Sequence, residues 1–363
     1  MGGVRFGVIG CGTISTLAYL PAIKGEYAGY PLELVAVCDA VEEKAVSAAK
    51  RFGARKHYAR YEDLLADPEV DAVIVATNIA THAEIGLAAV RAGKHVLIQK
   101  PIAETLEEAD RIIEEARRRG VKLQVEPPHM LNPFCVRSRE LISSGALGQV
   151  CLVQASSSHA GAEDRPWLFQ RAGGGSVMLD LAVHALTWLT GLLGPVAQVT
   201  AMATTSVPER VINGEPVKVD IEDNVTILLR FRDGCLGTVV SNYVTIANKA
   251  PTINIYGTDG TIHLESGMSP FLLFSRKGKY LEHDGWLEPT VYAGHLARPL
   301  TVQRATPSGE LPPHNSVAHF VECIVEDKQP VPSGEFARHV LEIMLAAMES
   351  ARSGRTIELQ TSF

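Results

Sequence analysis

Residues 4–15, VRFGVIGCGTIS, decide the fold that we expect for this chain. The first six are mostly apolar and predict a short buried strand, which two glycines follow at once. Glycines one residue apart between a strand and a helix allow a tight turn and let the backbone approach a pyrophosphate, whose charge then meets the helix N-terminus. Ser15 stands where a third glycine is usual, and an ordinary turn has a similar composition. The position after the first strand favours a dinucleotide site, in which we expect contacts from Gly10, Gly12, Thr13 and Ile14.

The next apolar segment, residues 32–38, predicts a second strand that ends at Asp39. This aspartate stands at the distance from the glycines at which a carboxylate accepts hydrogen bonds from the adenosine ribose hydroxyls. Asp39 and Glu42 also have the spacing of a capping box, which would start a helix through Arg51, and the two roles are compatible. No arginine follows within ten residues to bind a 2′-phosphate, so the sequence favours NAD over NADP.

Strands and helices then alternate along the chain. Further strands are expected at 71–76, 95–98 and 121–125, and helices at 61–66, 81–92 and 106–119. Such alternation implies right-handed crossovers and a parallel sheet covered on both faces. Residues 1–126 are therefore predicted to form a Rossmann domain with a doubly wound parallel sheet. Ligands of such sheets bind at the carboxyl ends of the strands.

Polar residues follow two of these strands at the edge where ligands bind. Thr77 and Asn78 follow one strand, although Asn78 is also a common turn residue, and Gln99-Lys100-Pro101 follows the next. Proline has no amide hydrogen, so the chain leaves the sheet there and places Lys100 at the edge. A solvated surface lysine would show the same pattern. We expect five residues of this edge to contact the cofactor: Thr77, Asn78, His82, Gln99 and Lys100.

After residue 126 the pattern changes. The prolines at 127 and 128 break the alternation, and a helix is expected at 132–143 and a strand at 150–156. Strand-like segments separated by turn signals follow at 196–204, 225–231, 236–243, 252–256 and 261–264. Residues 283–313 have the composition of long loops, and amphipathic helices are expected at 316–326 and 335–353. Residues 127–363 are therefore predicted to form an α+β domain with an open, mostly antiparallel sheet.

One helical segment of this second domain carries two ionisable side chains. Residues 173–188, GGGSVMLDLAVHALTW, place three glycines before an apolar run that contains Asp180 and His184. Residues four apart lie on one helical face, one turn from each other. A histidine paired with a carboxylate is common in protein cores, so this segment by itself is compatible with a structural pair or a catalytic one. Trp167 precedes the glycines and either stacks on a sugar or packs against the turn.

These features together resemble the Gfo/Idh/MocA family, named for glucose-fructose oxidoreductase and inositol dehydrogenase. The resemblance rests on the glycine loop after the first strand, on Lys100-Pro101, and on the three glycines before Asp180 and His184, in this order along most of the chain. It implies a Rossmann domain joined to an open-sheet α/β domain, a nicotinamide cofactor, and sugar, cyclitol or related hydroxyl and carbonyl substrates. Lys100, Asp180 and His184 match the family's catalytic residues, and with Trp167 they are the expected substrate contacts.

Four positions depart from the family pattern. Gln99 replaces an acidic residue before the lysine, and Asn78, Ala182 and Thr187 replace a proline, a glycine and an acidic residue. The change at Gln99 removes a charge beside the expected nicotinamide site. These departures bear on substrate identity more than on reaction class.

The expected reaction explains why these three residues occur together. Oxidation of a secondary alcohol sends a hydride to the nicotinamide, while an imidazole that titrates near neutral pH takes the hydroxyl proton. His184 is the expected base, Lys100 is expected to hold the substrate oxygen, and Asp180 to bind a neighbouring hydroxyl or steady the imidazole. We therefore expect His184 to lie near Lys100. An NAD-dependent glycoside hydrolase of the same fold and a non-catalytic dinucleotide-sensing regulator are the alternatives.

Composition limits other classes of function. With 34 Lys and Arg against 41 Asp and Glu the net charge is −7, and no basic cluster indicates binding to nucleic acid or an anionic membrane. No apolar segment approaches the ~20 residues of a membrane span and the N-terminus lacks a signal pattern, so a cytoplasmic location is expected. The six cysteines are scattered and the histidines lack metal-ligand spacing, so we expect free thiols and no metal. The family resemblance, together with the apolar open sheet, implies a homodimer or homotetramer.

Overall fold

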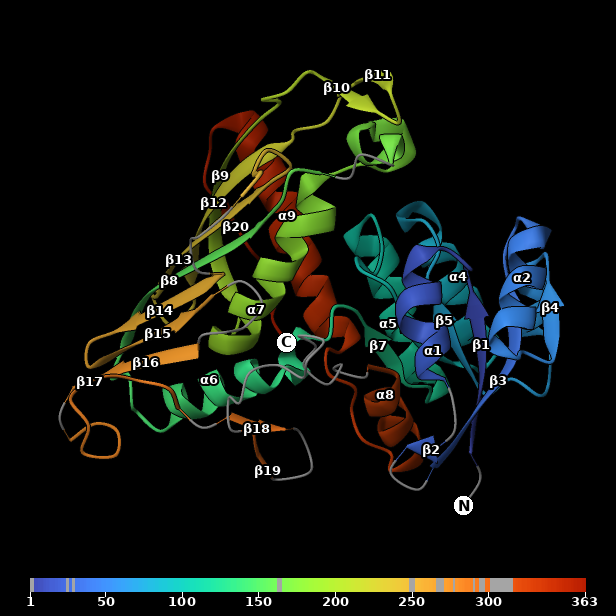
Figure 1. Cartoon of the computed structure of the whole chain (residues 1–363), viewed down its shortest axis with the longest axis horizontal. Helices are drawn as coiled ribbons and strands as arrows, with labels where there is room; N and C mark the ends of the chain where they lie inside the picture. Colours follow the sequence, from blue (N-terminus) through green and yellow to red (C-terminus); the bar gives the residue numbers. More distant parts are fainter. Residues whose placement is uncertain are drawn as a thin grey trace. The chain divides into compact units, whose positions relative to one another are not determined.

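The computed structural model describes residues 3–23, 26–27, 30–161, 165–247, 252–265, 271–276, 278–289, 291–293, 298–300 and 316–363. The chain forms two compact units, one of Met1–Pro128 with Asn315–Leu341 and one of His129–His314 with Glu342–Phe363 (Figure 1). We expected all residues after 126 in the second domain, whereas Asn315–Leu341 groups with the first unit. Helix α9 (Gly334–Ser353) therefore begins in one unit and ends in the other.

The first unit contains a mainly parallel sheet. Its strands follow the order β3 (Tyr30–Cys38), β1 (Val4–Ile9), β5 (Ala72–Val75), β6 (His95–Ile98) and β7 (Leu123–Val125), and neighbours in this series are parallel. β4 (Lys56–Tyr58) pairs with β3 in parallel, and β2 (Glu26–Tyr27) pairs with it antiparallel. The strand order reverses between β1 and β5, as in doubly wound sheets. The predicted Rossmann fold is confirmed, although the sequence does not predict β2 or β4.

Helices connect these strands: α2 (Glu42–Phe52), α3 (Tyr61–Leu65), α4 (Ile79–Arg91) and α5 (Leu106–Arg119). The sequence fixes both ends of α5. Thr105 accepts a hydrogen bond from the Glu108 amide and Glu108 accepts one from the Thr105 amide, which is a capping box. Gly120 ends the helix in the left-handed conformation, and three arginines in the last turn complement the helix dipole.

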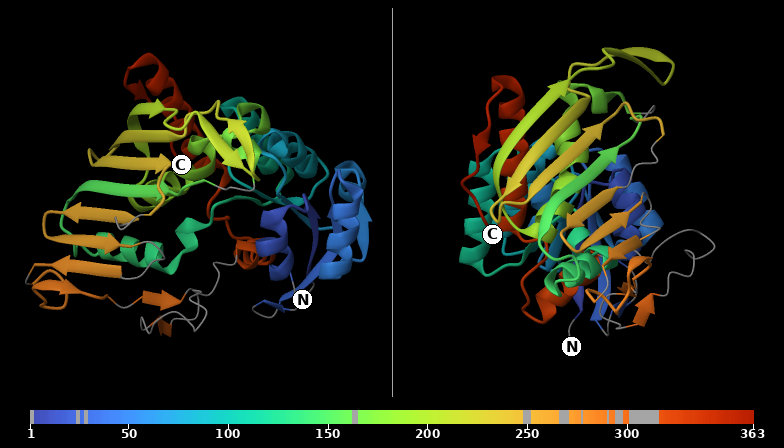
Figure 2. Two further views of the ribbon diagram at one scale, coloured as in Figure 1. Left: turned by 45° about the horizontal axis from the view of Figure 1, so that its top comes forward. Right: turned by 90° about the vertical axis from the view of Figure 1, so that its left-hand side faces the viewer.

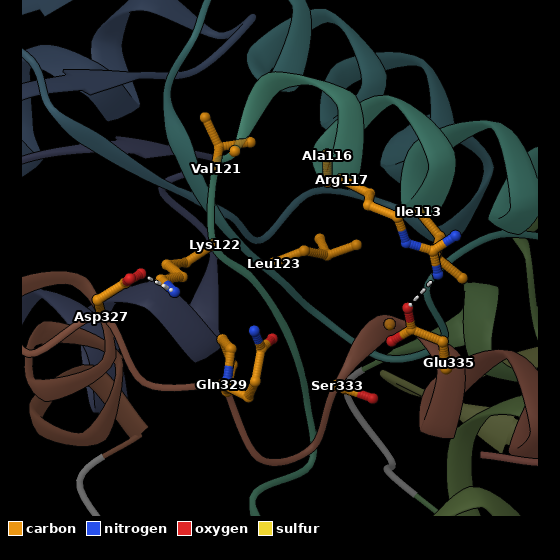
Figure 3. Close-up of a pocket in the computed structure, with 13 residues that line it drawn as sticks. Ile113, Ala116, Arg117, Val121, Lys122, Leu123, Asp327, Gln329, Ser333 and Glu335 are labelled. Atoms are coloured by element: carbon orange, nitrogen blue, oxygen red, sulfur yellow. Dashed lines mark hydrogen bonds and ion pairs between the residues drawn. The ribbon is translucent and has the colours of Figure 1, made fainter.

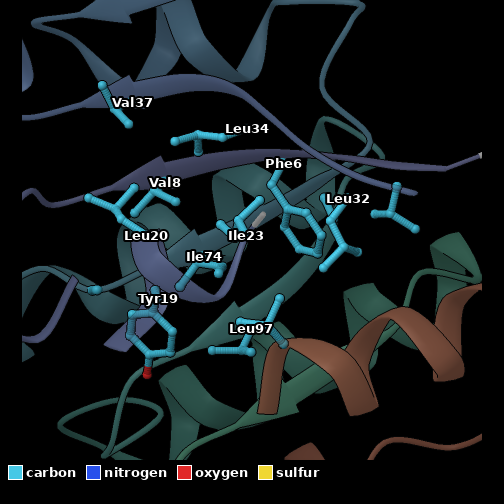
Figure 4. Packing of buried hydrophobic residues seen from close by; sticks show 14 of the residues in the cluster. Phe6, Val8, Tyr19, Leu20, Ile23, Leu32, Leu34, Val37, Ile74 and Leu97 are labelled. Atoms are coloured by element: carbon cyan, nitrogen blue, oxygen red, sulfur yellow. The ribbon is translucent and has the colours of Figure 1, made fainter. Parts of the chain in front are cut away.

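A hydrophobic core of the first unit packs against its sheet. Apolar side chains from the strands and from the segment after the glycine loop meet there, among them Phe6, Val8, Leu20, Leu34 and Ile74 (Figure 4). Helix α8 (Ser316–Val325) adds Val317, Phe320 and Val321 to the same cluster. Burial of such a side chain contributes about 1.5–3 kcal/mol. Apolar packing by α8 thus explains why this late segment groups with the first unit.

The second unit is built on one large sheet. In the described residues its order is β17 (Gly285–Leu287), β16 (Phe271–Ser275), β15 (Gly260–Leu264), β14 (Ile253–Gly257), β8 (Val150–Ser158), β13 (Leu236–Asn242), β12 (Asn224–Phe231), β9 (Val196–Thr204) and β20 (Ile357–Glu358). Neighbouring strands are antiparallel except β8 and β13, which are parallel. Figure 2 shows this sheet from two directions. The predicted mostly antiparallel sheet is confirmed.

The two faces of this sheet differ in their surroundings. Helix α7 (Val183–Leu193) packs against β8 and β13, and α6 (Pro133–Ser143) packs against α7. Along β12, Val225, Ile227 and Leu229 are buried while the alternate Thr226 and Leu228 are exposed. Side chains alternate between the faces of a strand, so the exposed residues share the face opposite the buried ones.

Several short strands lie in segments for which the sequence predicts no strand. β10 (Glu209–Ile212) and β11 (Glu215–Lys218) form a hairpin around Asn213-Gly214, a dipeptide that favours tight hairpin turns because both residues adopt positive φ. The prediction of loops after residue 283 is wrong for β17, β18 (Val291–Ala293) and β19 (Arg298–Leu300). Residues 301–313 of that prediction lie outside the described residues.

The six cysteines are free, and five are buried while Cys151 is exposed. Within the described ranges, no helix has the length and apolar character needed to cross a membrane.

Candidate active site

In the first unit, the predicted cofactor residues gather at the carboxyl edge of the parallel sheet. The glycine loop follows β1, Asp39 follows β3, Thr77 comes shortly after β5, and Gln99 with Lys100 follows β6. Because β3, β1, β5 and β6 are adjacent and parallel, these residues share one edge. The edge therefore brings together segments that lie far apart in the sequence.

The glycine loop has the backbone form that a dinucleotide site needs. Gly10 has a φ of 95°, and a Cβ there would stand 2.4 Å from the Ala76 carbonyl oxygen. A Cβ at Gly12 would meet no described atom within 4 Å, so the backbone there is open to a ligand. Ser15 fills the place of the third glycine and is buried, and its hydroxyl donates to the Gly10 carbonyl at 2.5 Å. Thr13 and Ile14 are exposed beside the loop.

The helix after this loop begins with a π-helical turn, Ser15–Tyr19, before α1 (Leu20–Ala22). The Leu20 amide donates to the Ser15 carbonyl, five residues back. Pro21 follows and has no amide hydrogen, so a regular α-helical bond to Leu17 cannot form. The sequence does not predict this turn, although Pro21 is a signal for irregular geometry.

Asp39 holds the glycine loop in place. Its Oδ2 accepts the Cys11 amide at 2.8 Å and its Oδ1 accepts the Val41 amide at 2.9 Å. The capping-box alternative is wrong, because α2 begins after Val41, which has no side-chain cap, and Asp39 lies outside the helix. A carboxylate oxygen accepts more than one hydrogen bond, so Asp39 retains the capacity to bind ribose hydroxyls. These acceptor oxygens fit the ribose hydroxyls of NAD.

Residues after β5 are linked to those after β6 through His82. Its Nδ1 lies 2.7 Å from the Pro101 carbonyl oxygen and its Nε2 lies 3.1 Å from that of Thr77. Burial lowers the pKa of His82, so one N–H is available and the shorter contact suits donation to Pro101. His82 is 1% exposed and lies between the two loops, whereas Asn78 is exposed at the N-terminus of α4. Contact of either residue with the cofactor stays a prediction.

Gln99 connects Lys100 to a buried tyrosine. Its Oε1 accepts the Lys100 amide at 3.0 Å, and its Nε2 donates to the Tyr19 hydroxyl at 2.5 Å. Beyond Tyr19 lies Glu126, whose pKa burial raises to about 7 although the Ser316 and Tyr19 hydroxyls act to lower it. The Glu126 Oε1 atom is buried with no hydrogen-bond partner in the described part of the chain. Glu126 was not among the predicted site residues, and its only signal in the sequence is its place just after β7.

In the second unit, the three glycines allow a close approach of two backbones. A Cβ at Gly175 would stand 2.4 Å from the Leu168 carbonyl oxygen, and one at Gly173 would stand 2.8 Å from the Trp167 Cβ. Trp167 therefore lies against the glycine turn, as the packing alternative expects, yet its side chain is 47% exposed. Its contact with substrate stays a prediction.

The segment of Asp180 also begins with a π-helical turn, Met178–Ala182, which α7 continues. The regular α-helix expected here is therefore wrong for its first turn. Asp180 Oδ2 accepts a hydrogen bond from the Tyr243 hydroxyl at 2.7 Å. Burial first, and then Asp180, raises the pKa of Tyr243, so the phenol stays protonated and donates. Phe169 packs edge-on to Tyr243 with ring centroids 5.5 Å apart.

His184 also has an aromatic partner that the sequence analysis missed. Its Nδ1 lies 2.8 Å from Nε2 of His129, which belongs to the 3-10 turn His129–Leu131. The ring of Trp188, one turn after His184, lies 5.8 Å from that of His129. His129 follows the two prolines that break the alternation, and no local pattern marks it. Asp180 and His184 thus each have a hydrogen-bond partner other than one another.

The first unit also has a pocket that lies away from the carboxyl edge of its parallel sheet. It lies between the C-terminal end of α5, the start of β7 and the segment 327–335 (Figure 3). Its charged lining residues are paired, Lys122 with Asp327 at 2.6 Å and Arg117 with Glu335 at 3.0 Å. Because Lys122 precedes β7, the pocket lies at the amino end of that strand, away from the predicted cofactor residues. Within the described residues no group of three or more His, Cys, Asp or Glu side chains is placed to hold a metal ion.

Comparison with known proteins identifies relatives of both units. A family model described as "Oxidoreductase family, NAD-binding Rossmann fold" matches residues 4–127, and one described as "GFO/IDH/MocA C-terminal domain" matches residues 136–263. The chain is 29% identical over 287 residues to levoglucosan dehydrogenase of Pseudarthrobacter phenanthrenivorans, covering 72% of this chain and 73% of that protein. It is 24% identical over 371 residues to myo-inositol 2-dehydrogenase of Thermotoga maritima, covering 98% and 99%.

A solved structure of levoglucosan dehydrogenase in complex with NADH and L-sorbose is similar over 99% of both chains, with a TM-score of 0.84 and 25% identity. The matches confirm the predicted class, a dehydrogenase or reductase acting on CH–OH groups, and NAD as the predicted cofactor. The chain belongs to the Gfo/Idh/MocA family of oxidoreductases.

Proposed function

We propose that this protein transfers a hydride between nicotinamide and a secondary hydroxyl or carbonyl group of a sugar, cyclitol or related polyol. The observation that supports this most is that two polar side chains of the second unit are held by hydrogen bonds. Asp180 is bonded to Tyr243, and His184 is bonded to His129. The chain carries them together with a glycine loop suited to a dinucleotide. Its relatives named for levoglucosan and myo-inositol act on substrates of this class.

In this proposal each polar group has one task. Bound NAD supplies the hydride acceptor or donor. His184 accepts the hydroxyl proton during oxidation and returns it during reduction, because an imidazole changes charge near neutral pH. Lys100 binds the same substrate oxygen and stabilises negative charge that develops on it. Asp180, held by Tyr243, accepts a hydrogen bond from a neighbouring hydroxyl.

The preference for NAD over NADP rests on Asp39. Its carboxylate already binds the loop amide of Cys11, so a ribose 2′-phosphate would add negative charge beside a fixed negative charge. Loop contacts from Gly10, Gly12, Thr13 and Ile14, and edge contacts from Thr77, Asn78, His82, Gln99 and Lys100, complete the proposed cofactor site.

We also propose a homodimer or homotetramer. On the exposed face of the large sheet, Met202 is 80% exposed, Leu228 is 52% exposed and Val240 is 37% exposed. Met202 and Val240 both pair with Thr226 in register, so they form a row across β9, β12 and β13. Burial of such a face in a second copy removes apolar area from water. A monomer by light scattering at micromolar concentration would contradict this. The cytoplasmic location expected from the sequence stays a prediction.

A substrate screen tests the proposed function. Purified protein is incubated with NAD and a panel of sugars and cyclitols, and with NADH and the corresponding keto forms, while nicotinamide absorbance is recorded. A stoichiometric absorbance change with at least one compound is expected. Product formation without a net change would instead indicate the glycoside hydrolase alternative. Binding of NADH with no turnover of any compound would favour the regulator.

A further inference from the structure

We propose that His129 is a positioning residue that holds the proton of His184 on Nδ1 and thereby keeps Nε2 of His184 unprotonated for catalysis. This inference rests on the proposed function, in which His184 is the base. It assigns a role to a residue that neither the glycine motif nor the helix of Asp180 includes.

The geometry places a single proton between the two rings. Nε2 of His129 and Nδ1 of His184 are 2.8 Å apart, and the ring centroids are 5.1 Å apart with an interplanar angle of 54°. This separation is that of a hydrogen bond, in which one nitrogen donates and the other accepts. The direction of that bond decides the tautomer of each imidazole, because a neutral imidazole has only one N–H.

Only one direction is compatible with a base at His184. If His184 donates from Nδ1, its Nε2 carries a lone pair and can take the substrate proton. If His129 donates instead, Nε2 of His184 already holds a proton and cannot act as a base. When Nε2 takes up the substrate proton, the Nδ1–H still donates to His129 and the bond becomes charge-assisted. His129 therefore stabilises the protonated state that oxidation creates.

The packing around His129 limits the movement of its ring. Trp188 is 3% exposed, and its ring is tilted by 31° to that of His129. Met130, the next residue of the 3-10 turn, lies so close to α7 that a Cβ at Gly191 would stand 2.7 Å from its Cγ. The His129 turn and α7 thus form one packed element, and the acceptor atom is fixed toward His184.

Two substitutions at His129 separate hydrogen bonding from packing. His129→Phe keeps a ring beside Trp188 but removes the acceptor, whereas His129→Gln supplies an amide oxygen at about the reach of Nε2. Oxidation kcat/KM is expected to fall about 10- to 100-fold in H129F and to recover to within about threefold of wild type in H129Q. His263→Phe makes the same change at a histidine whose ring contacts Asn254 and Trp286 instead, so it is the matched control and should leave kcat/KM unchanged.

Nitrogen NMR of histidine-labelled protein gives a readout independent of turnover. His184 signals, assigned by their loss in His184→Ala, should show a protonated Nδ1 and an unprotonated Nε2 in wild type, and a mixture of tautomers in H129F. A protonated Nε2 on the neutral His184 ring of the wild-type protein would overturn the proposal, as would unchanged kcat/KM in H129F or an equal loss in H263F. Retained turnover in H184A would instead contradict the part of the proposed function that makes His184 the base, whatever tautomer the spectra show.

Discussion

In the described part of the chain two π-helical turns follow glycines, and they organise their surroundings in different ways. The turn Ser15–Tyr19 in the first unit follows a glycine loop that makes its contacts through backbone atoms. The Gly10 backbone packs against the Ala76 carbonyl, and the Cys11 amide donates to Asp39. The turn Met178–Ala182 in the second unit and helix α7, which continues it, present side chains instead. Asp180 binds a tyrosine 63 residues away and His184 binds a histidine 55 residues away.

This difference separates a site made by local backbone from a site made by distant side chains. A backbone site depends on residues that permit a conformation, and glycine is the clearest of these. A side-chain site depends on which partners the fold brings close. We therefore expect substitutions in the first region to act on stability and cofactor binding, and substitutions in the second to act on turnover with the fold retained.

The largest effect is expected at the side-chain site. His184→Ala removes the proposed base and should lower kcat by about 10²- to 10⁴-fold. NADH binding, measured by fluorescence titration, should stay near wild type, because the backbone site is unchanged. Wild-type turnover in this variant with every accepted substrate would show that another group takes the proton.

The next largest effect is expected on the free energy of unfolding, from the buried carboxyl group of Glu126 in the first unit. Burial raises the pKa of Glu126 to about 7 from its ordinary value of 4.5, so the folded state holds its proton more tightly than the unfolded chain does. A raised carboxyl pKa stabilises the fold at low pH, and this contribution is lost as pH rises from about 4.5 through about 7.

Glu126→Gln removes this dependence. The free energy of unfolding of the variant relative to wild type should therefore rise by about 2–3 kcal/mol between pH 5 and pH 8. Urea unfolding at both pH values measures it, with the exposed Glu104→Gln as the control. A difference that stays constant with pH would mean that Glu126 is ionised in the folded protein as in the unfolded chain.

Two glycines of one loop sharpen the comparison further. Gly10→Ala forces a Cβ onto a positive φ and to within 2.4 Å of a carbonyl oxygen, so the free energy of unfolding should fall by about 2 kcal/mol or more. Gly12→Ala meets no described atom and should change stability by less than about 0.5 kcal/mol, while weakening NADH binding. If both substitutions lowered the free energy of unfolding equally, Gly12 would be needed for the fold, and not only for the approach of the ligand to the backbone.

The smallest effect on turnover is expected at Tyr243, which acts only by holding the side chain of Asp180. Tyr243→Phe keeps the ring contact with Phe169 and removes the hydroxyl that donates to Asp180. Turnover efficiency should fall about tenfold, equivalent to about 1.4 kcal/mol. Tyr256→Phe removes an exposed hydroxyl from Gln154 and serves as the control. A drop of the same size in both variants would assign no special role to the Asp180 contact.

Sequence reasoning could predict the first region because its information is local. Hydrophobic strands, the glycine pair and Asp39 lie within one continuous segment, and the parallel sheet then places Thr77 and Lys100 on the same edge. The π-turn before Pro21 was beyond such reasoning, because periodicity does not distinguish an irregular first turn from a regular one.

The second region was predicted only in part, because its contacts join segments that are far apart in the sequence. Asp180 and His184 lie in one helical segment and are visible in the sequence, whereas their partners His129 and Tyr243 come from other segments. Likewise, the apolar face of α8 indicates that it covers a core, but only the fold shows that this core belongs to the first unit. Pairings between distant segments are set by packing, which a single sequence does not display.

Following the transferred hydride with deuterium tests the proposed function most directly. A secondary alcohol substrate from the screen is prepared with deuterium on the carbon to be oxidised, and the nicotinamide product is examined by mass spectrometry. The proposed function predicts one deuterium in each reduced nicotinamide and one reduced nicotinamide for each ketone formed. Product formed without reduced nicotinamide, or reduced nicotinamide without deuterium, would contradict it.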